Sequence, residues 1–169
     1  AGTIPDLRFA LVGGAPCPPE LVTRAQDRGV PVAPTYGMTE AASQIATARP
    51  GEARAAPESV GNPPMFAQVT VADRTGAVCE TGEPGELVVS GPMVTPGYLD
   101  EGTTERRFGT RGLRTGDRGY RDSTGRLYVQ GRGDDTIITG GEHVHPGAAE
   151  STLRTHPAVA GCGSVGMPE

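Results

Sequence analysis

The chain opens with apolar runs that alternate between strand and helix signatures. Residues 1–60 carry two short apolar runs of strand length. Between them, a stretch begins with two prolines and stops before a glycine, as helices often do. The expected elements are a buried strand at Leu7–Val12, a helix at 18–27, a strand at Val30–Ala33 and a short helix after Thr39. This order predicts the end of an α/β subdomain, in which functional groups gather at the carboxyl ends of the strands.

The middle of the chain changes to the alternation of half-buried strands. Apolar and polar residues alternate over short segments with Gly-rich turns between them, a spacing typical of a small barrel or sandwich. The predicted strands are Gln68–Ala72, Gly85–Gly91 and Arg126–Gln130. We therefore expect a β-barrel-like subdomain over residues 61–131.

The pattern changes once more near the end of the sequence. The expected elements there are a strand at Thr136–Ile138, a helix from Pro146 to His156 and a strand at Val159–Val165. A segment of about 35 residues cannot bury a core alone, so we expect the start of a small α+β C-terminal domain. The predicted fold class is α+β, with subdomains at 1–60 and 61–131, a hinge at 132–135 and a truncated C-terminal lid domain at 136–169.

Composition and charge exclude several classes of function. The net charge is −5 and the basic residues are scattered, so we expect no nucleic-acid partner. The 3 cysteines lack the spacing of a metal site and are typical of reduced thiols in a cytoplasmic protein. No signal peptide is evident, and no apolar run is long enough to span a bilayer. All 15 basic residues are arginine, so no side chain of this chain supplies a primary amine.

Several polar and glycine-rich motifs together suit the activation of a carboxylate by ATP. Such chemistry needs a flat slot for adenine, a carboxylate for the ribose diol, and a hydroxyl and a metal ligand where charge builds at the α-phosphate. The candidates are Gly13, Gly14, Ala15, Tyr36 and Gly37 for the adenine slot, Thr39 for the phosphate, Glu40 for magnesium, and Asp117 with Arg132 for the ribose.

Each motif taken alone also has a plainer structural interpretation. Tyr36-Gly37 is typical of a turn beside a packed ring, and Thr39-Glu40 of a helix N-cap followed by an acidic first turn. Thr115-Gly116-Asp117 is typical of a hairpin turn, and Asp134-Asp135 of a solvated turn. Only the combination and order of the motifs favour the functional interpretation.

That order resembles the adenylate-forming enzymes, a family that contains acyl-CoA synthetases, luciferases and the adenylation domains of peptide synthetases. The motifs that carry the resemblance are Tyr36-Gly37-Met38-Thr39-Glu40, Gly85-Glu86-Leu87, Gly97-Tyr98, Thr115-Gly116-Asp117 and Gly131-Arg132-Gly133-Asp134-Asp135. Together they extend over most of the chain.

The resemblance implies a role for each matching residue. Tyr36 would stack on adenine, Thr39 would contact the AMP phosphate and Glu40 would bind magnesium, which makes Thr39 and Glu40 the catalytic candidates. Asp117, helped by Arg132, would bind the ribose. Asp134 would be the hinge about which a small C-terminal domain rotates between two half-reactions. Gly140, Gly141 and Glu142 would belong to a loop that swings inward for the thioester step.

Two segments favour the acyl-CoA synthetase branch of the family. Gly140-Gly141-Glu142-His143 and the residues up to Pro146 resemble the corresponding loop of CoA ligases. Gly37–Ile45 resembles the o-succinylbenzoate–CoA ligases of menaquinone biosynthesis. Ser43 and Gln44 would then meet the acid substrate, although helix capping and solvent contact explain them equally well. The implied ligands are a carboxylic acid, ATP or AMP, Mg²⁺ and coenzyme A, and a homodimer stays open.

The family also uses lysines that this chain lacks. A phosphate-loop lysine would precede residue 1 and a catalytic lysine would follow residue 169, so we expect a fragment of an enzyme about three times longer, inactive by itself and completed by the rest of its own polypeptide. Three alternatives remain open: another acyl- or aryl-CoA synthetase, a peptide-synthetase adenylation domain, and a non-catalytic AMP-binding module.

Overall fold

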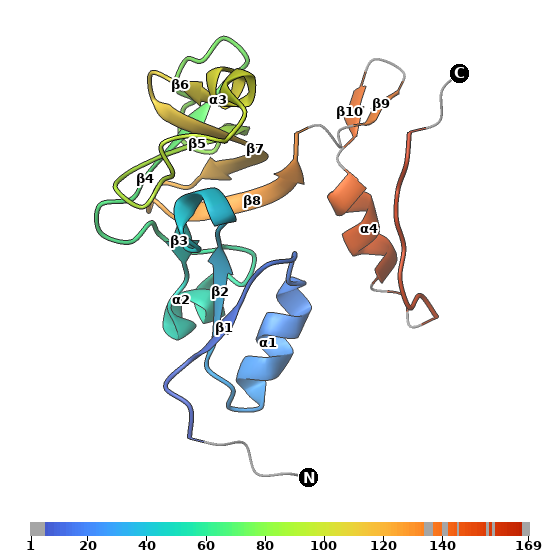
Figure 1. Ribbon diagram of the computed structural model, residues 1–169. Helices are drawn as coiled ribbons and strands as arrows, with labels where there is room; N and C mark the ends of the chain where they lie inside the picture. Colours follow the sequence, from blue (N-terminus) through green and yellow to red (C-terminus); the bar gives the residue numbers. More distant parts are fainter. Residues whose placement is uncertain are drawn as a thin grey trace.

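The protein has an α+β fold, as the sequence predicts, and its described residues form three sheets (Figure 1). The computed structural model describes residues 6–133, 137–139, 142–144, 146–154, 156 and 158–166. A three-stranded sheet with two helices lies at one end of the molecule, a curled five-stranded sheet at the other, and a two-stranded sheet beside them.

The first sheet is part of a short β-α-β unit. Its elements are β1 (Ala10–Val12), α1 (Pro19–Asp27), β2 (Val32–Tyr36), the 3-10 helix η1 (Thr39–Ala41), β3 (Ala46–Thr47) and α2 (Pro50–Ala55). Strands β1 and β2 are parallel, and β3 pairs with β2 in the antiparallel sense. Helix α1 begins with Pro19 in its first turn, and Gly29 follows its end with φ +82°, as the proline and glycine pattern predicts.

The first strand is shorter and less buried than the sequence predicts. It covers only Ala10–Val12, and Phe9 and Leu11 are 52% and 49% exposed. Val12 packs into the cluster that α1 covers, whereas the face that carries Phe9 and Leu11 has no cover among the described residues. A strand with a helix on one face only cannot be buried on both, so the expectation of a buried strand at Leu7–Val12 is wrong.

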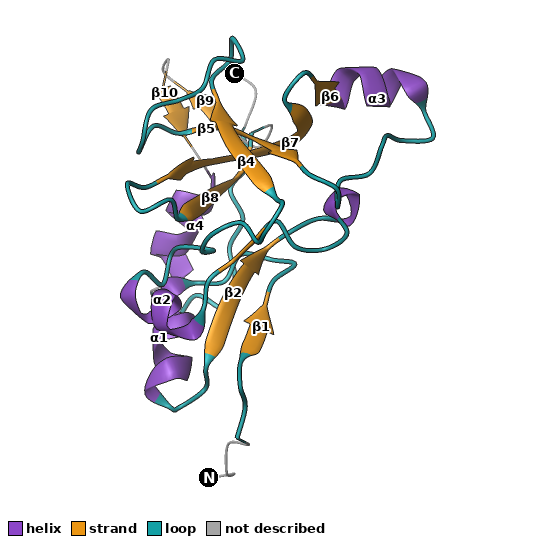
Figure 2. Ribbon diagram, turned by 90° about the vertical axis from the view of Figure 1, so that its left-hand side faces the viewer, coloured by secondary structure: helices purple, strands orange, loops and turns teal. Residues whose placement is uncertain are grey.

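The five-stranded sheet is antiparallel and is organised around one long strand. Its elements are β4 (Gln68–Ala72), β5 (Gly85–Ser90), α3 (Glu101–Arg107), β6 (Phe108–Gly109), β7 (Gly112–Arg121) and β8 (Leu127–Arg132). Strand β5 pairs with β4 and β7, while β6 and β8 pair with opposite ends of β7. This arrangement lets the sheet curl, as Figure 2 shows, and it agrees with the barrel-like prediction.

One hydrophobic cluster joins the two larger sheets. Ile45 and Ala46, which lie just after η1, pack with Leu87 of β5 and Leu127 of β8, and all four are fully buried. The loop after β2 is therefore fixed against the curled sheet. This shared core brings residues near 40 and residues near 117 to one place.

The last part of the chain is a hairpin followed by a helix. Strands β9 (Ile137–Thr139) and β10 (Glu142–Val144) are antiparallel, and α4 (Pro146–Arg154) contacts β8. Residues 158–166 form no strand, which contradicts the strand predicted at Val159–Val165. Ser164 N instead donates to Glu150 Oε1 of α4 at 2.8 Å, so the segment is attached to the helix by a side chain. No helix among the described residues is long and apolar enough to cross a membrane.

Candidate nucleotide site

Three strands bring an aspartate, a tyrosine and an arginine together. Tyr36, at the end of β2, donates its hydroxyl to Asp117 Oδ2 of β7 at 2.5 Å. Arg132, at the end of β8, contacts Asp117 Oδ1 through Nη1 at 3.2 Å. Asp117 is only 8% exposed. The two ribose candidates and the adenine candidate, far apart in the sequence, therefore form one hydrogen-bonded group.

Asp117 lies on a bulge inside β7. Glu86 pairs with Arg118 and Val88 pairs with Arg114, so Leu87 alone faces three residues of β7. Those three residues are Thr115, Gly116 and Asp117, and Gly116 has φ +76°. The interpretation of this motif as a hairpin turn is therefore wrong. A bulge with glycine in the left-handed region redirects the next side chain out of the ladder.

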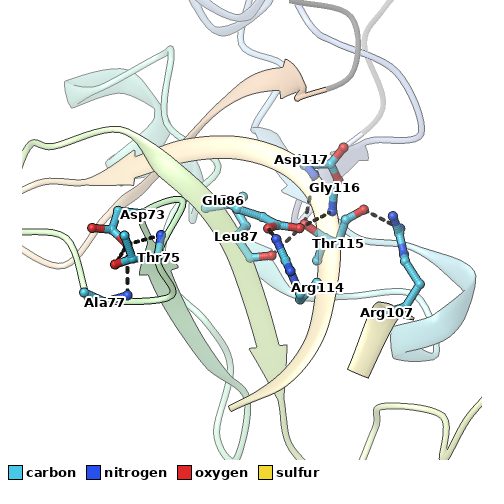
Figure 3. Close-up of polar contacts among 10 residues, drawn as sticks. All are labelled: Asp73, Thr75, Ala77, Glu86, Leu87, Arg107, Arg114, Thr115, Gly116 and Asp117. Atoms are coloured by element: carbon cyan, nitrogen blue, oxygen red, sulfur yellow. Dashed lines mark hydrogen bonds and ion pairs between the residues drawn. The ribbon is translucent and has the colours of Figure 1, made fainter. Parts of the chain in front are cut away.

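The bulge is held by hydrogen bonds from several sides (Figure 3). Thr115 is fully buried, and its hydroxyl donates to Leu87 O at 2.7 Å and accepts from Asp117 N at 3.0 Å. Gly116 N donates to Glu86 Oε1 at 3.3 Å, and Arg114 binds the other oxygen of Glu86 through two nitrogens at 2.9 and 2.6 Å. These contacts fix the direction of Asp117.

The electrostatics of the group favour a protonated tyrosine beside the carboxylate. Burial, and then the hydrogen bond to Asp117, raises the pKa of Tyr36 far above its ordinary value of 10.0. Tyr36 therefore donates to Asp117 at any physiological pH. A carboxylate has about four acceptor positions, so Asp117 keeps capacity for the two hydroxyls of a ribose beside Tyr36 and Arg132.

The predicted glycine slot lies next to Tyr36. Strands β1 and β2 are in parallel register, with Val12 opposite Pro34, so both strands end at the same edge. A Cβ atom on Gly13 would lie 2.6 Å from Thr35 Cγ2, which shows how closely this turn packs against β2. Gly14 and Ala15 follow on the surface and are exposed. The structure thus brings the two glycine-containing motifs together, as predicted.

Gly37 has a packing requirement of its own. A Cβ atom at this position would lie 1.4 Å from the carbonyl oxygen of Ser43, so no side chain fits. The loop returns on itself because Ala42 and Ser43 have positive φ values of 47° and 96°. Ile45 N closes the loop on Tyr36 O at 2.8 Å. The glycine is needed by the loop itself, whether or not a nucleotide approaches.

Glu40 is oriented from two sides by the segment before α3. Tyr98 donates its hydroxyl to Glu40 Oε1 at 2.8 Å, and Thr95 N donates to the main-chain oxygen of Glu40 at 2.7 Å. The hydrogen bond from Tyr98 lowers the pKa of Glu40 below its usual value. Thr39, the residue before it, is exposed.

Glu40 suits a magnesium ion that also binds phosphate. No group of three or more His, Cys, Asp or Glu side chains gathers among the described residues. Magnesium in nucleotide sites commonly takes only one or two protein carboxylates and completes its shell with water and phosphate oxygens. A single half-exposed carboxylate in an anionic form fits that pattern.

Ser43 and Gln44 line a surface hollow of about 320 Å³, together with Phe66 and Met93. Both residues are exposed. Ser43 does not cap η1, because the N-cap is Met38, with no side-chain hydrogen bond, and the C-cap is Ala42. The capping interpretation of Ser43 is therefore wrong, and the substrate role remains a prediction.

The predicted hinge and thioester loop are only partly visible. Asp134, Gly140 and Gly141 lie outside the described residues, and Glu142 is the first residue of β10.

Sequence reasoning missed two polar residues at the site. Arg107, in the last turn of α3, donates to Thr115 O at 2.7 Å, and Tyr98 holds Glu40. Tyr98 belongs to the Gly97-Tyr98 motif, which contributed to the family resemblance but received no functional role from the sequence. Arg107 lies in a charged run, Glu105-Arg106-Arg107, with nothing in the sequence to separate it from a solvated helix surface.

The fold is that of the adenylate-forming enzymes. The chain belongs to the family of AMP-binding enzymes, whose sequence profile matches residues 2–99.

Individual relatives agree along nearly the whole chain. It is 42% identical over 165 residues to the 2-succinylbenzoate–CoA ligase of Bacillus subtilis (strain 168). The matched region covers 97% of this chain and 34% of that protein. Among solved structures, o-succinylbenzoate CoA synthetase (MenE) from Bacillus subtilis in complex with the acyl-adenylate intermediate OSB-AMP has a TM-score of 0.93 and 41% identity, covering 98% of this chain and 34% of that one.

The same Bacillus subtilis synthetase in complex with ATP and magnesium ion has a TM-score of 0.88 and 39% identity, covering 97% of this chain and 36% of that one. The chain thus spans about a third of the length of the curated relatives that it matches.

Proposed function

We propose that this chain is the nucleotide-binding part of an ATP-dependent carboxylate–CoA ligase, and that the acid is o-succinylbenzoate, as in menaquinone biosynthesis. The observation that carries the proposal is the group formed by Tyr36, Asp117 and Arg132, because it joins three strands at one buried carboxylate. The 42% identity to a 2-succinylbenzoate–CoA ligase supports the choice of acid.

In the first half-reaction, an oxygen of the substrate carboxylate attacks the α-phosphorus of ATP. An acyl–O–P bond forms, and the bond to the β-phosphate oxygen breaks, so that pyrophosphate leaves. Asp117 would accept the ribose hydroxyls, Tyr36 would line the adenine slot with Gly13, Gly14 and Ala15, and Thr39 would donate to the α-phosphate. Glu40 would hold a magnesium ion, which supplies positive charge at the phosphates.

In the second half-reaction, the sulfur of coenzyme A attacks the acyl carbon. A thioester forms, the bond between the acyl carbon and the AMP oxygen breaks, and the thiol proton goes to solvent. This step would involve the predicted hinge at 132–135, between the subdomain 61–131 and the C-terminal domain, and the loop with Gly140, Gly141 and Glu142. Ser43 and Gln44 would contact the acid from the hollow beside η1.

The co-substrate, the location and the assembly are also proposals. Coenzyme A as the co-substrate, a cytoplasmic location and assembly as a homodimer are all compatible with a small-molecule ligase. Coenzyme A follows from the proposed ligase activity, whereas the location and the homodimer are separate proposals.

The test is ATP–pyrophosphate exchange, measured on the natural full-length protein that carries this sequence and on the 169-residue chain alone. Separate reactions would contain o-succinylbenzoate, benzoate, a medium-chain fatty acid and a set of amino acids. Exchange by the full-length protein with o-succinylbenzoate supports the proposal. Exchange with another acid only would correct the substrate, and exchange with amino acids would favour a peptide-synthetase domain. No exchange with any acid would leave a non-catalytic AMP-binding module as the better explanation.

A further inference from the structure

We propose that Tyr98 is a positioning residue for Glu40, which holds this carboxylate in an orientation that leaves Oε2 to a magnesium ion. The inference rests on the proposed function in one respect, namely that Glu40 binds the metal. It adds a residue to which neither the sequence motifs nor the relatives give a role.

The contact between the two side chains is direct. The Tyr98 hydroxyl donates to Glu40 Oε1 at 2.8 Å across 58 positions of sequence. A carboxylate has two oxygens, so engaging Oε1 leaves Oε2 for a cation. Thr95 N also donates to the main-chain oxygen of Glu40 at 2.7 Å, so the same short segment holds both the backbone and the side chain of this residue.

Tyr98 is itself fixed in place by α3 and β6. Its main-chain N donates to Thr104 Oγ1 at 2.8 Å, and its ring meets Phe108 edge to face with centroids 6.3 Å apart. Gly97 packs closely against Thr104, since a Cβ atom there would lie 3.0 Å from two of its side-chain atoms. The phenol therefore points at Glu40 because of contacts that do not involve Glu40.

Such positioning matters because of what magnesium requires. Mg²⁺ demands near-ideal octahedral geometry at short distances, and a freely rotating glutamate would sample many orientations that do not meet this demand. Partners that orient metal ligands typically change metal affinity by 10–100-fold when they are removed. Among the described residues, no side chain other than that of Tyr98 donates a hydrogen bond to Glu40 Oε1.

The experiment compares Tyr98→Phe with a matched control. Tyr98→Phe removes one hydroxyl and keeps the ring contact with Phe108. Tyr128→Phe removes an equivalent hydrogen bond, from Tyr128 Oη to Asp122 Oδ2 at 3.2 Å, near the turn between β7 and β8. Each full-length protein would be titrated with Mn²⁺ in the presence of ATP, with free Mn²⁺ measured by electron paramagnetic resonance. ATP binding without metal would be measured by equilibrium dialysis.

The expected result is specific to the metal. Tyr98→Phe should weaken Mn²⁺ binding to the ATP complex by about 10-fold and leave metal-free ATP binding unchanged, while Tyr128→Phe changes neither. Unchanged Mn²⁺ affinity in Tyr98→Phe would overturn the inference. So would an equal loss of metal-free ATP binding, because that would indicate a general structural role.

A third variant separates this inference from the proposed function. Glu40→Gln should weaken Mn²⁺ binding at least as strongly as Tyr98→Phe. If Glu40→Gln weakens it and Tyr98→Phe does not, Glu40 binds the metal and the positioning role is wrong. If Glu40→Gln has no effect, the metal assignment within the proposed function is itself wrong.

Discussion

The bulge of β7 and the loop 37–44 form two sides of the candidate site, and they are stabilised differently. The bulge lies inside a five-stranded sheet, where Thr115 is fully buried and Asp117 nearly so. The loop lies at a strand end, where Thr39, Ser43 and Gln44 are exposed. Side-chain hydrogen bonds shape the bulge, whereas main-chain hydrogen bonds and left-handed residues shape the loop.

This difference puts the proposed ribose contact in a buried setting and the proposed phosphate and acid contacts in an exposed loop. A buried bulge with satisfied hydrogen bonds fixes the carboxylate of Asp117, for which we propose the ribose as ligand, a part of the nucleotide that does not react. A strained surface loop carries the groups that would meet the phosphates and the acid, and left-handed non-glycine residues there cost roughly 1–2 kcal/mol each. Strain of this kind persists only where its surroundings over-determine it, and here the tight contact between Gly37 and Ser43 does so.

The largest effect is expected from Gly37→Ala, on the loop side. The new Cβ atom cannot fit 1.4 Å from Ser43 O, so the loop must open and displace Thr39 and Glu40. Exchange activity should fall by at least 100-fold, an estimate based on the sensitivity of catalysis to displacements of about 1 Å. Gly51→Ala is the control, because Gly51 lies in α2 with nothing within 4 Å of a Cβ atom. Equal activity of both variants would contradict the tight packing of the loop.

On the bulge side, Asp117→Ala should have the next largest effect. Hydrogen bonds to a charged group contribute about 1.5–3 kcal/mol, so the dissociation constant for ATP should rise by roughly 10- to 150-fold. Equilibrium binding of ATP measures it. Asp73→Ala is the control, since Asp73 also accepts main-chain hydrogen bonds, from Thr75 and Ala77, in a turn away from the site (Figure 3). An unchanged ATP affinity in Asp117→Ala would refute the ribose assignment.

Thr115→Val tests whether the bulge is held mainly by its buried hydroxyl. The substitution keeps the shape but leaves Leu87 O and Asp117 N without this partner, which should cost about 1–3 kcal/mol of unfolding free energy. Urea unfolding measures the loss, and ATP affinity should fall with it because Asp117 is no longer directed. Thr115→Ser keeps a hydroxyl and should recover most of both. If Thr115→Val retains wild-type stability and affinity, the sheet alone determines the bulge.

The smallest expected effect is on the pH dependence of stability, through Tyr36, which links the loop side of the candidate site to Asp117 on the bulge. The pKa of Tyr36 is raised in the folded state above its ordinary value of 10.0, so the folded chain keeps a proton that the unfolded chain releases. The Tyr36 phenol therefore makes its full contribution to the free energy of unfolding below about pH 10. Above that pH the contribution decreases, by up to about 1.4 kcal/mol per pH unit.

Tyr36→Phe lacks this group, so the difference in melting temperature between the wild type and Tyr36→Phe should narrow as the pH rises above 10. Thermal unfolding at pH 8, 9, 10 and 11 would measure it. A constant difference over that range would show that the Tyr36 phenol is not shielded in the folded state.

The sequence predicted the elements whose signals are local. Proline and glycine marked the ends of α1, and alternation gave the strand Gln68–Ala72 with the bounds that the structure has. Helices α2 and α3 were not predicted. Each helix has at most two turns and contains a glycine. The N-terminus of α3 is capped by Asp100, whose side chain accepts a hydrogen bond from Thr103 N at 2.7 Å. Such short helices have little periodicity to detect.

What the sequence determined by itself was the list of chemical groups and their order. The motifs identified the candidates Tyr36, Glu40, Asp117 and Arg132, because a motif combines particular residue types at a fixed spacing along the chain. Only the tertiary structure decided how they meet. The bulge that directs Asp117 and the bond from Tyr98 to Glu40 join segments far apart along the chain. The contact that demands Gly37 lies within one loop and depends on the left-handed conformation of Ala42 and Ser43. Long-range pairing and side-chain direction depend on the packing of the whole core, and no local pattern encodes them.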